Sequence, residues 1–173
     1  NDTYVLDGWL DELLTTLREN ERVAIVGSQL LYPDGALQEA GGIVWKDASA
    51  WNYGRYGAPW RPEFSYLRSV DYCSGASIMI SKQRFEELGM FDTAYAPAYC
   101  EDVELAFQAR EKGYDVVYQP RSKVVHFEGI SSGTDTTKGV KAYQVVNLQH
   151  CHHFHQINFD HSHNDISTAL TCL

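Results

Sequence analysis

Residues 85–129, FEELGMFDTAYAPAYCEDVELAFQAREKGYDVVYQPRSKVVHFEG, contain the pattern that decides the fold. Apolar residues at helical spacing predict a helix over Val103–Lys112, which begins directly after two acidic residues. The apolar run Val116–Tyr118 predicts a strand that ends at Pro120, and Val124–Phe127 predicts a further short strand. This alternation of helix and strand indicates an α/β protein with a partly parallel sheet.

The residues upstream continue the same alternation. An apolar stripe on an otherwise polar segment predicts a helix over Trp9–Leu17, and the unbroken apolar run Val23–Val26 before Gly27 predicts a buried strand. Tyr32–Gly35 has the composition of a tight turn, so we expect a hairpin at this point. The segment Val70–Ile80 predicts a strand that enters through a Ser-Gly-Ala kink.

Length, composition and charge exclude several classes of protein. The chain has 173 residues, 44% hydrophobic and 21% charged, so we expect one globular domain and no disordered or collagen-like chain. Its net charge of −9 argues against a nucleic-acid partner. The sequence has no apolar run of the roughly 20 residues that span a bilayer, and it does not begin like a signal peptide. The scattered cysteines form no C-x-x-C pair, which fits a reducing cytoplasm.

Three acidic residues and one histidine are candidates for chemistry. Asp2 either holds a hard divalent cation that in turn binds a diphosphate, or caps a helix or turn. Glu101 and Asp102 precede a helix, where a carboxylate stays ionised and accepts a proton from a hydroxyl nucleophile, but helix capping selects the same residues. His126 lies on a short predicted strand, where it either completes a metal site begun by Asp2 or is a hydrogen-bonded core residue.

Aromatic and small residues suggest contacts with a sugar or a phosphate. Residues 45–66 are rich in aromatic side chains without a clear period, and we expect most of them to pack in the core. Trp51 and Tyr53 are the candidates for exposed rings that offer a flat face to a sugar. The Gly- and Ser-rich segment that contains Ser131 and Thr134 either closes over a bound phosphate group or only connects two elements.

Several segments in order resemble the family 2 glycosyltransferases with a GT-A fold. They are NDT (1–3), WLDELL (9–14), VGSQLLYPDGALQEAGGIVW (26–45), DYCSGASIMI (71–80), the stretch quoted above and SSGTDT (131–136). The resemblance covers residues 1–147 and implies a GT-A-like mixed sheet flanked by helices, of which this chain is the second, acceptor-side half. We expect a nucleotide-binding half to precede Asn1. Residues 148–173 form a His-rich tail that we expect to be irregular.

The resemblance gives the four candidates specific roles. Asp2 matches the last member of the family's metal-binding triplet and would bind Mn²⁺ or Mg²⁺ at the phosphates of a sugar nucleotide. His126 matches a position that contributes to the metal or diphosphate site in many members. Glu101 and Asp102 match the family's acidic pair, and Asp102 would be the general base of an inverting displacement.

The resemblance also implies residues that shape the substrate site. Ser74, Gly75 and Ala76 match a Ser-Gly-Ala segment that lies beside the donor sugar and the acceptor. Ser131 and Thr134 would lie on the flexible loop after the strand that ends near His126. Family members commonly have an aromatic or small residue where this chain has Cys100, which is a departure from the pattern.

The function implied is transfer of a sugar from a nucleotide-diphospho-sugar donor to a saccharide or lipid-linked acceptor, assisted by a divalent cation, in the synthesis of a cell-surface polysaccharide. We expect the protein in the cytoplasm, with a peripheral position at the inner face of the cell membrane left open. The alternative is a catalytically inactive half-domain that binds saccharide or another protein. Because half of a domain leaves a sheet edge and apolar surface exposed, we also expect self-association.

Overall fold

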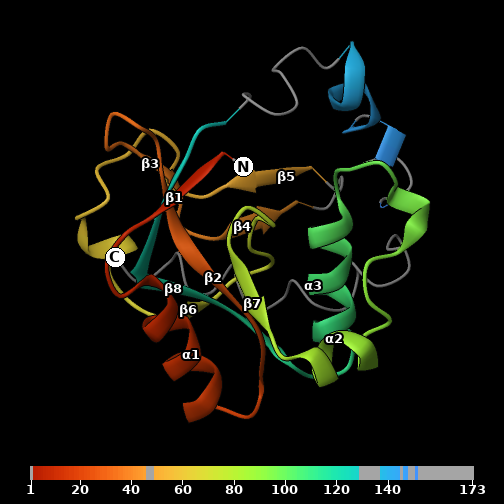
Figure 1. The fold of residues 1–173 in the computed structure, drawn as a ribbon, viewed down its shortest axis with the longest axis horizontal. Coiled ribbons are helices and arrows are strands. Elements are labelled where there is room, and N and C mark those ends of the chain that lie inside the picture. The colour runs from red at the N-terminus through yellow and green to blue at the C-terminus, as the bar shows by residue number, and fades with distance from the viewer. Residues whose placement is uncertain (1, 46–48, 129–136, 145, 148–150, 152–173) are drawn as a thin grey trace.

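The computed structural model describes residues 2–45, 49–128, 137–144, 146, 147 and 151 (Figure 1). The strands are β1 (Thr3–Val5), β2 (Val23–Leu31), β3 (Leu37–Glu39), β4 (Gly42–Val44), β5 (Ala50–Asn52), β6 (Arg68–Ser69), β7 (Ile78–Ile80) and β8 (Asp115–His126). The helices are α1 (Trp9–Glu19), α2 (Lys82–Glu87) and α3 (Glu101–Glu111), with short 3₁₀ turns η1 (Pro62–Phe64), η2 (Thr93–Tyr95) and η3 (Gly139–Ala142).

A mixed six-stranded sheet forms the centre of the molecule. Its main path runs β1-β8-β2-β3, with β6 also beside β8 and β7 also beside β2, and a separate hairpin joins β4 to β5. The two long strands β2 and β8 are parallel, whereas β1, β3, β6 and β7 run antiparallel to their partners. The predicted α/β class with a partly parallel sheet is therefore confirmed.

Helices α1 and α3 cover opposite faces of this sheet (Figure 1). Leu13 of α1 is fully buried and packs in one apolar cluster with Val26, whereas Leu105 of α3 packs in another with Ile25. Side chains of consecutive strand residues point to opposite faces, so the neighbours Ile25 and Val26 identify the two layers. The amphipathic stripe that predicted a helix from Trp9 is thus the face of α1 that packs on the sheet.

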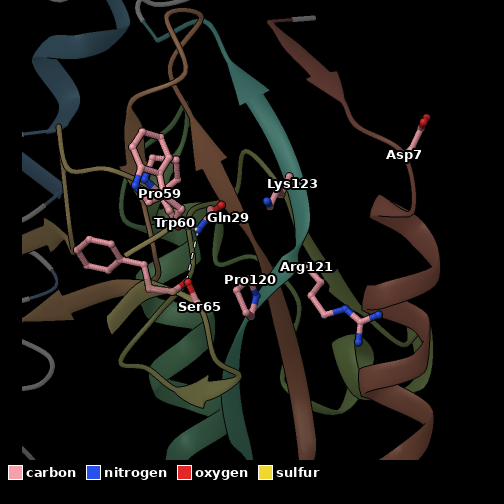
Figure 2. A pocket seen from close by; sticks show the side chains of 9 residues that line it. Asp7, Gln29, Pro59, Trp60, Ser65, Pro120, Arg121 and Lys123 are labelled. Carbon is pink, nitrogen blue, oxygen red and sulfur yellow. Dashed lines mark hydrogen bonds between the residues drawn. The ribbon is translucent and has the colours of Figure 1, made fainter. Parts of the chain in front are cut away.

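Strand β8 is one continuous strand, so the prediction of two short strands separated by Pro120 is wrong. The register against β2 shifts in its middle: Ser28 lies opposite Gln119, but the next residue, Gln29, lies opposite Lys123. Pro120 falls in the bulge between these two pairs (Figure 2), where its missing N–H is not needed for the ladder.

Strand β2 is also longer than predicted, because it passes through Gly27 and ends at Leu31. A Cβ atom added at Gly27 would lie 2.3 Å from the Cβ of Cys73, so the glycine allows another segment to approach the strand closely. The turn after β2 and the hairpin to β3 are as predicted, with Gly35 at a φ of 86°.

The segment Val70–Ile80 is predicted to be a strand that enters through a Ser-Gly-Ala kink, and the structure has a strand after that kink, at Ile78–Ile80. The preceding residues form turns whose polar groups bond elsewhere. Asp71 accepts a hydrogen bond from the N–H of Val44 at 2.9 Å, and the N–H of Ser77 donates to the carbonyl of Ser74 at 3.2 Å. Tyr72 also forms an isolated bridge to Gly42, whose N–H donates to the Tyr72 carbonyl at 2.8 Å, and the Ser-Gly-Ala segment that follows is a loop.

Three of the cysteines, Cys73, Cys100 and Cys151, are buried free thiols. Cys172 lies outside the described residues, as does the His-rich tail from residue 148 onward apart from Cys151. Within the part of the chain that is described, no helix combines the length and apolar character needed to cross a membrane.

Candidate active site

Asp102 lies in the first turn of α3 and faces the Ser-Gly-Ala loop. Its Oδ2 accepts a hydrogen bond from the N–H of Gly75 at 2.8 Å, and its Oδ1 accepts one from the N–H of Val103 at 2.8 Å. Burial raises the pKa of the Asp102 carboxyl above its ordinary value, while these two hydrogen bonds act to lower it. The structure thus brings together two segments that the sequence selected separately. Ser74 also orders this loop, because its Oγ accepts from the N–H of Ala76 at 3.3 Å.

Glu39 is a second carboxyl at this place, and the sequence reasoning missed it. Its side chain is only 1% exposed, and Oε1 accepts a hydrogen bond from the N–H of Ser74 at 2.9 Å. Burial, opposed by this hydrogen bond and aided by the charge of Asp102, raises the pKa of Glu39 to about 8. Its Oε2 is buried and has no hydrogen-bond partner in the structure as described. In the sequence Glu39 follows Gln38 and precedes the small residues Ala40–Gly42, and this small-residue context was the available signal.

The chain enters α3 through an uncommon backbone conformation. Tyr99 and Cys100 have φ angles of 79° and 74°, in the left-handed region that residues with a Cβ atom seldom occupy. Asn147, far along the chain, is buried there, and its Nδ2 donates to the carbonyls of Tyr95, Ala98 and Tyr99 at 2.8, 2.8 and 3.1 Å. The side chain of Asn147 therefore fixes the loop from which Asp102 emerges.

Glu101 precedes Asp102 and is half-buried. Burial raises the pKa of Glu101, and the charge of Asp102 adds to this effect. Its Oε2 is among the buried oxygen atoms without a hydrogen-bond partner in the described structure. Both members of the predicted acidic pair therefore favour the protonated form more than an exposed carboxyl does.

Asp2 and His126 meet at the end of β8, as the sequence predicted. Thr3 pairs with His126 between β1 and β8, and the His126 Nε2 lies 3.8 Å from the Asp2 Oδ2. The other ring nitrogen, Nδ1, is 2.8 Å from the Oε1 of Gln38 on β3. The hydrogen bond to Gln38 orients the imidazole ring so that Nε2 faces Asp2.

These two side chains fit one edge of a divalent cation site. An imidazole nitrogen oriented by a hydrogen bond at the opposite nitrogen, next to a carboxylate, is a common donor pair in metal sites. Among the described residues there is no group of three or more His, Cys, Asp and Glu side chains that could hold a metal ion by itself. A cation held by Asp2 and His126 would therefore need further oxygen ligands, such as those of a diphosphate.

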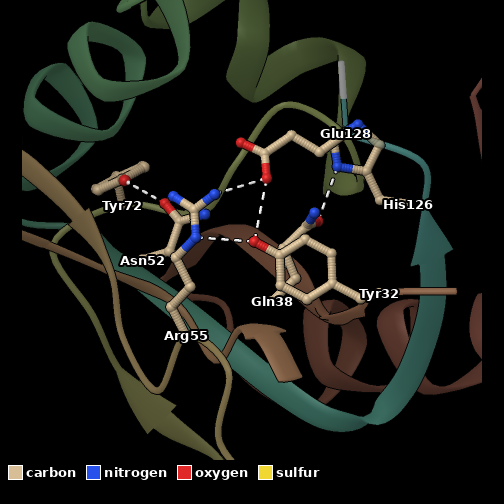
Figure 3. A network of polar contacts seen from close by, with 7 residues as sticks. All are labelled: Tyr32, Gln38, Asn52, Arg55, Tyr72, His126 and Glu128. Atoms are coloured by element: carbon tan, nitrogen blue, oxygen red, sulfur yellow. Dashed lines mark hydrogen bonds and ion pairs between the residues drawn. The ribbon is translucent and has the colours of Figure 1, made fainter. Parts of the chain in front are cut away.

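A polar network lies beside this pair (Figure 3). The Arg55 Nη2 contacts the Oε2 of Glu128 at 2.7 Å, its Nε donates to the hydroxyl of Tyr32 at 2.8 Å, and that hydroxyl donates to Glu128 at 3.1 Å. The network therefore joins three segments: Tyr32 directly after β2, Arg55 shortly after β5 and Glu128 two residues after the end of β8. Ser131 and Thr134 come shortly after Glu128 but lie outside the described residues, so their predicted roles remain untested.

The two aromatic candidates have different environments. Trp51 is 63% exposed and meets the partly exposed Trp45 edge to face, with ring centroids 5.9 Å apart. Tyr53 is half-buried: its ring packs on Phe64 at 5.3 Å, with the guanidinium carbon of Arg68 4.4 Å from the ring centroid. The expectation of an exposed ring is therefore confirmed for Trp51 and wrong for Tyr53, which fills the space under the loop after β5.

No family model matches the chain. The O-antigen biosynthesis protein RfbC of Myxococcus xanthus is 32% identical over 147 residues, which is 78% of this chain and 11% of that protein. An N-acetylglucosaminyl-diphospho-decaprenol L-rhamnosyltransferase of Mycobacterium tuberculosis is 26% identical over 147 residues, which is 79% of this chain and 48% of that enzyme. The chain thus spans less than half of each of these relatives.

The crystal structure of GalNAc-T7 with UDP, GalNAc and Mn²⁺ matches the fold with a TM-score of 0.54 at 16% identity. The match covers 72% of this chain and 26% of that chain. The chain therefore has a mixed α/β sheet with flanking helices like that of a GT-A glycosyltransferase, as predicted. Together with the sequence matches, this makes it a distant homologue of glycosyltransferases.

Proposed function

We propose that this chain is the acceptor-side part of a family 2 glycosyltransferase that uses a nucleotide-diphospho-sugar. Residues 1–147 would form this part of the domain, and residues 148–173 a tail outside it. The observation that carries the proposal is the Asp102 carboxyl, held at the start of α3 by the N–H of Gly75 at 2.8 Å. The likeness to an O-antigen biosynthesis protein and to a rhamnosyltransferase supports a role in making a cell-surface polysaccharide from a saccharide or lipid-linked acceptor.

Asp102 would act as the general base of the transfer. It accepts the proton of an acceptor hydroxyl while that oxygen forms a bond to the anomeric carbon of the donor sugar. The bond from that carbon to the phosphate oxygen breaks, its electron pair leaves with the nucleoside diphosphate, and the anomeric configuration inverts. A carboxyl whose pKa is raised by burial is a stronger base than an exposed one, which suits this step. Ser74, Gly75 and Ala76 would line the place where donor sugar and acceptor meet.

Asp2 and His126 would hold the cation, Mn²⁺ or Mg²⁺. When bound, such a cation supplies positive charge to the diphosphate leaving group. The 3.8 Å approach of the two side chains, and the hydrogen bond that orients His126 through Gln38, support this assignment. The proposal separates the site into a base at α3 and a cation position at the ends of β1 and β8.

The test is the substitution Asp102→Asn, with Asp92→Asn as the matched control. Asp92 is an exposed aspartate that caps η2 through the N–H of Ala94, and asparagine keeps this cap. In the complete protein, which also carries the nucleotide-binding half, we expect Asp102→Asn to lower kcat at least about 100-fold, measured as nucleoside diphosphate released from a panel of nucleotide sugars with Mn²⁺. Its KM for the donor should stay within a few-fold of that of the wild type, and Asp92→Asn should behave like the wild type. Transfer at the wild-type rate by Asp102→Asn would refute the role of the base.

The alternative function is a saccharide-binding module without catalysis. The exposed edge-to-face pair of Trp45 and Trp51 favours it, because such rings offer apolar faces to sugars. A chelator separates the two functions. Transfer and donor binding should be lost with EDTA, whereas a module that uses only these rings should bind saccharide equally well with and without it. A complete wild-type protein that releases no nucleoside diphosphate from any donor but binds saccharide in EDTA would establish the alternative.

A further inference from the structure

A pocket separate from the proposed active site lies where β2 and β8 change register (Figure 2). It has a volume of about 450 Å³ and shares no residue with the Asp102 loop or with the Asp2–His126 pair. Its walls come from the β8 bulge and from the loop before η1, and include Gln29, Pro59, Trp60, Pro120, Arg121 and Lys123. The bulge therefore creates a concave surface in the middle of the sheet, where regular strands would leave none.

The amide of Gln29 has a fixed orientation in this pocket. The Tyr118 hydroxyl donates to the carbonyl of Phe64 at 2.8 Å, so its oxygen is the acceptor for the Gln29 Nε2 at 2.7 Å. The same Nε2 donates to the carbonyl of Pro59 at 3.3 Å. Rotating the amide by half a turn would place Oε1 against these oxygens, so the observed orientation is the stable one.

This orientation leaves the Oε1 of Gln29 buried without a hydrogen-bond donor among the described residues. The side chain as a whole is only 1% exposed. An unsatisfied buried acceptor costs about 1–3 kcal/mol, which a donor from a ligand would recover. Gln29 lines the pocket, so this unsatisfied acceptor lies in the pocket wall, and a ligand hydroxyl that displaces the wall slightly would satisfy it.

Positive charge lies next to this acceptor. Lys123 is the register partner of Gln29 on the adjacent strand, its side chain is exposed, and within the described part of the chain it makes no ion pair. Arg121 lines the same pocket but is already paired with Glu12 at 2.9 Å. Asp7, the one acidic residue in the lining, is set apart from Gln29 in Figure 2. Lys123 is therefore the cation available to an anionic group near the Gln29 oxygen.

An exposed aromatic ring completes the pocket. Trp60 is 78% exposed, and Pro59 precedes it on the same loop (Figure 2). An indole ring pairs with the apolar face of a sugar while the sugar hydroxyls remain free to bond elsewhere. A flat ring, an acceptor and a cation together match a polar ring that carries both hydroxyl groups and a negative charge.

We propose that this pocket binds an acidic saccharide, meaning a sugar that carries a carboxylate or a phosphate. Its ring stacks on Trp60, one of its hydroxyl groups donates to the Oε1 of Gln29, and its acidic group contacts the ammonium of Lys123. Binding at this pocket does not depend on the proposed transfer reaction, so it can be measured whether or not the protein catalyses that reaction.

The test measures binding of glucuronate, glucose 6-phosphate, glucose and inorganic phosphate by calorimetry and saturation-transfer NMR. We expect the two acidic sugars to bind more tightly than glucose, and Lys123→Met to weaken them at least about tenfold while leaving glucose unchanged. Trp60→Ala should weaken all three sugars. Lys82→Met, which removes an exposed lysine on α2, is the matched control and should change nothing. Both residues to be replaced in the pocket are exposed, so these variants should keep the fold.

Comparing the affinities of the two acidic sugars shows whether the pocket prefers a carboxylate or a phosphate. Tighter glucuronate binding assigns a carboxylate, and tighter glucose 6-phosphate binding assigns a phosphate. Inorganic phosphate that binds as well as glucose 6-phosphate and is insensitive to Trp60→Ala would reduce the pocket to an anion site and overturn the proposal. Failure of both acidic sugars to bind at millimolar concentration would overturn it as well.

Discussion

The buried carboxyl of Glu39 should dominate the dependence of stability on pH. Burial raises its pKa in the folded protein to about 8, whereas in an unfolded chain a glutamate has a pKa of about 4.3. The folded state therefore holds this proton more tightly, and its full contribution to stability is present below about pH 4.3. As the pH rises from there to about 8, linkage should lower the free energy of unfolding by at most about 5 kcal/mol.

The substitution Glu39→Gln removes this titration while its amide oxygen still accepts the hydrogen bond from the N–H of Ser74. Urea unfolding of wild type and variant at pH 5, 7 and 8.5 gives the free energies of unfolding. The variant should gain over the wild type as the pH rises, by about 4 kcal/mol between pH 5 and pH 8.5, because about 1 kcal/mol of the whole effect falls below pH 5.

The role of Glu39 is tested by the difference in the free energy of unfolding between the two proteins at each pH, and not by the slope of either curve. Asp102 and Glu101 also have pKa values raised by burial and contribute to the slope of both proteins. Glu19→Gln, at the exposed end of α1, is the control and should not change the slope of the wild type. Parallel curves for wild type and Glu39→Gln across this range would refute the conclusion that Glu39 is buried as a neutral acid.

Three further substitutions test the packing that supports the site and the effect of burial on its ion pairs. Gly42→Ala would place a Cβ atom 1.9 Å from the Cε1 of Tyr72, so the ring must move, and we expect a loss of about 1–3 kcal/mol in thermal unfolding; a variant as stable as the wild type would contradict the close approach. Arg110→Met leaves the buried carboxylate of Asp71, which it contacts at 2.7 Å, without its counter-charge and should cost about 3 kcal/mol in urea unfolding. Arg22→Met, which breaks an exposed pair with N–O distance 3.5 Å, should cost less than about 1 kcal/mol, and equal losses for the two arginines would refute the importance of burial.

The helices could be predicted from the sequence because their patterns are local. The apolar stripe from Trp9 lies wholly within α1, and the acidic start and glycine end of α3 lie within one short segment, and both helices are present. The strands were predicted less well. Pro120 ends an isolated strand, and only the register shift against β2 explains why β8 continues through it. Such a shift belongs to a pair of strands, so neither segment alone indicates it.

In the candidate site, too, some features could be predicted from the sequence and others depend on segments far apart in the chain. The closeness of Asp2 to His126 followed from the resemblance to a family in which matching positions meet. Glu39 had no such signal, because the N–H that bonds it belongs to Ser74, 35 residues away, and the charge that helps to raise its pKa belongs to Asp102 on a separate helix. Tyr53 was assigned to the surface because nothing near it in sequence indicates that Phe64 and Arg68 enclose its ring.

The Ser-Gly-Ala segment acts at this site mainly through its backbone. The N–H of Ser74 bonds Glu39 and the N–H of Gly75 bonds Asp102, so two carboxyls are bound by consecutive amides of one loop. The loop reaches this position because Gly27 has no Cβ atom to collide with Cys73, which directly precedes Ser74. Substitutions of the Ser74 side chain should therefore disturb the two carboxyls less than any change that moves this loop away from β2.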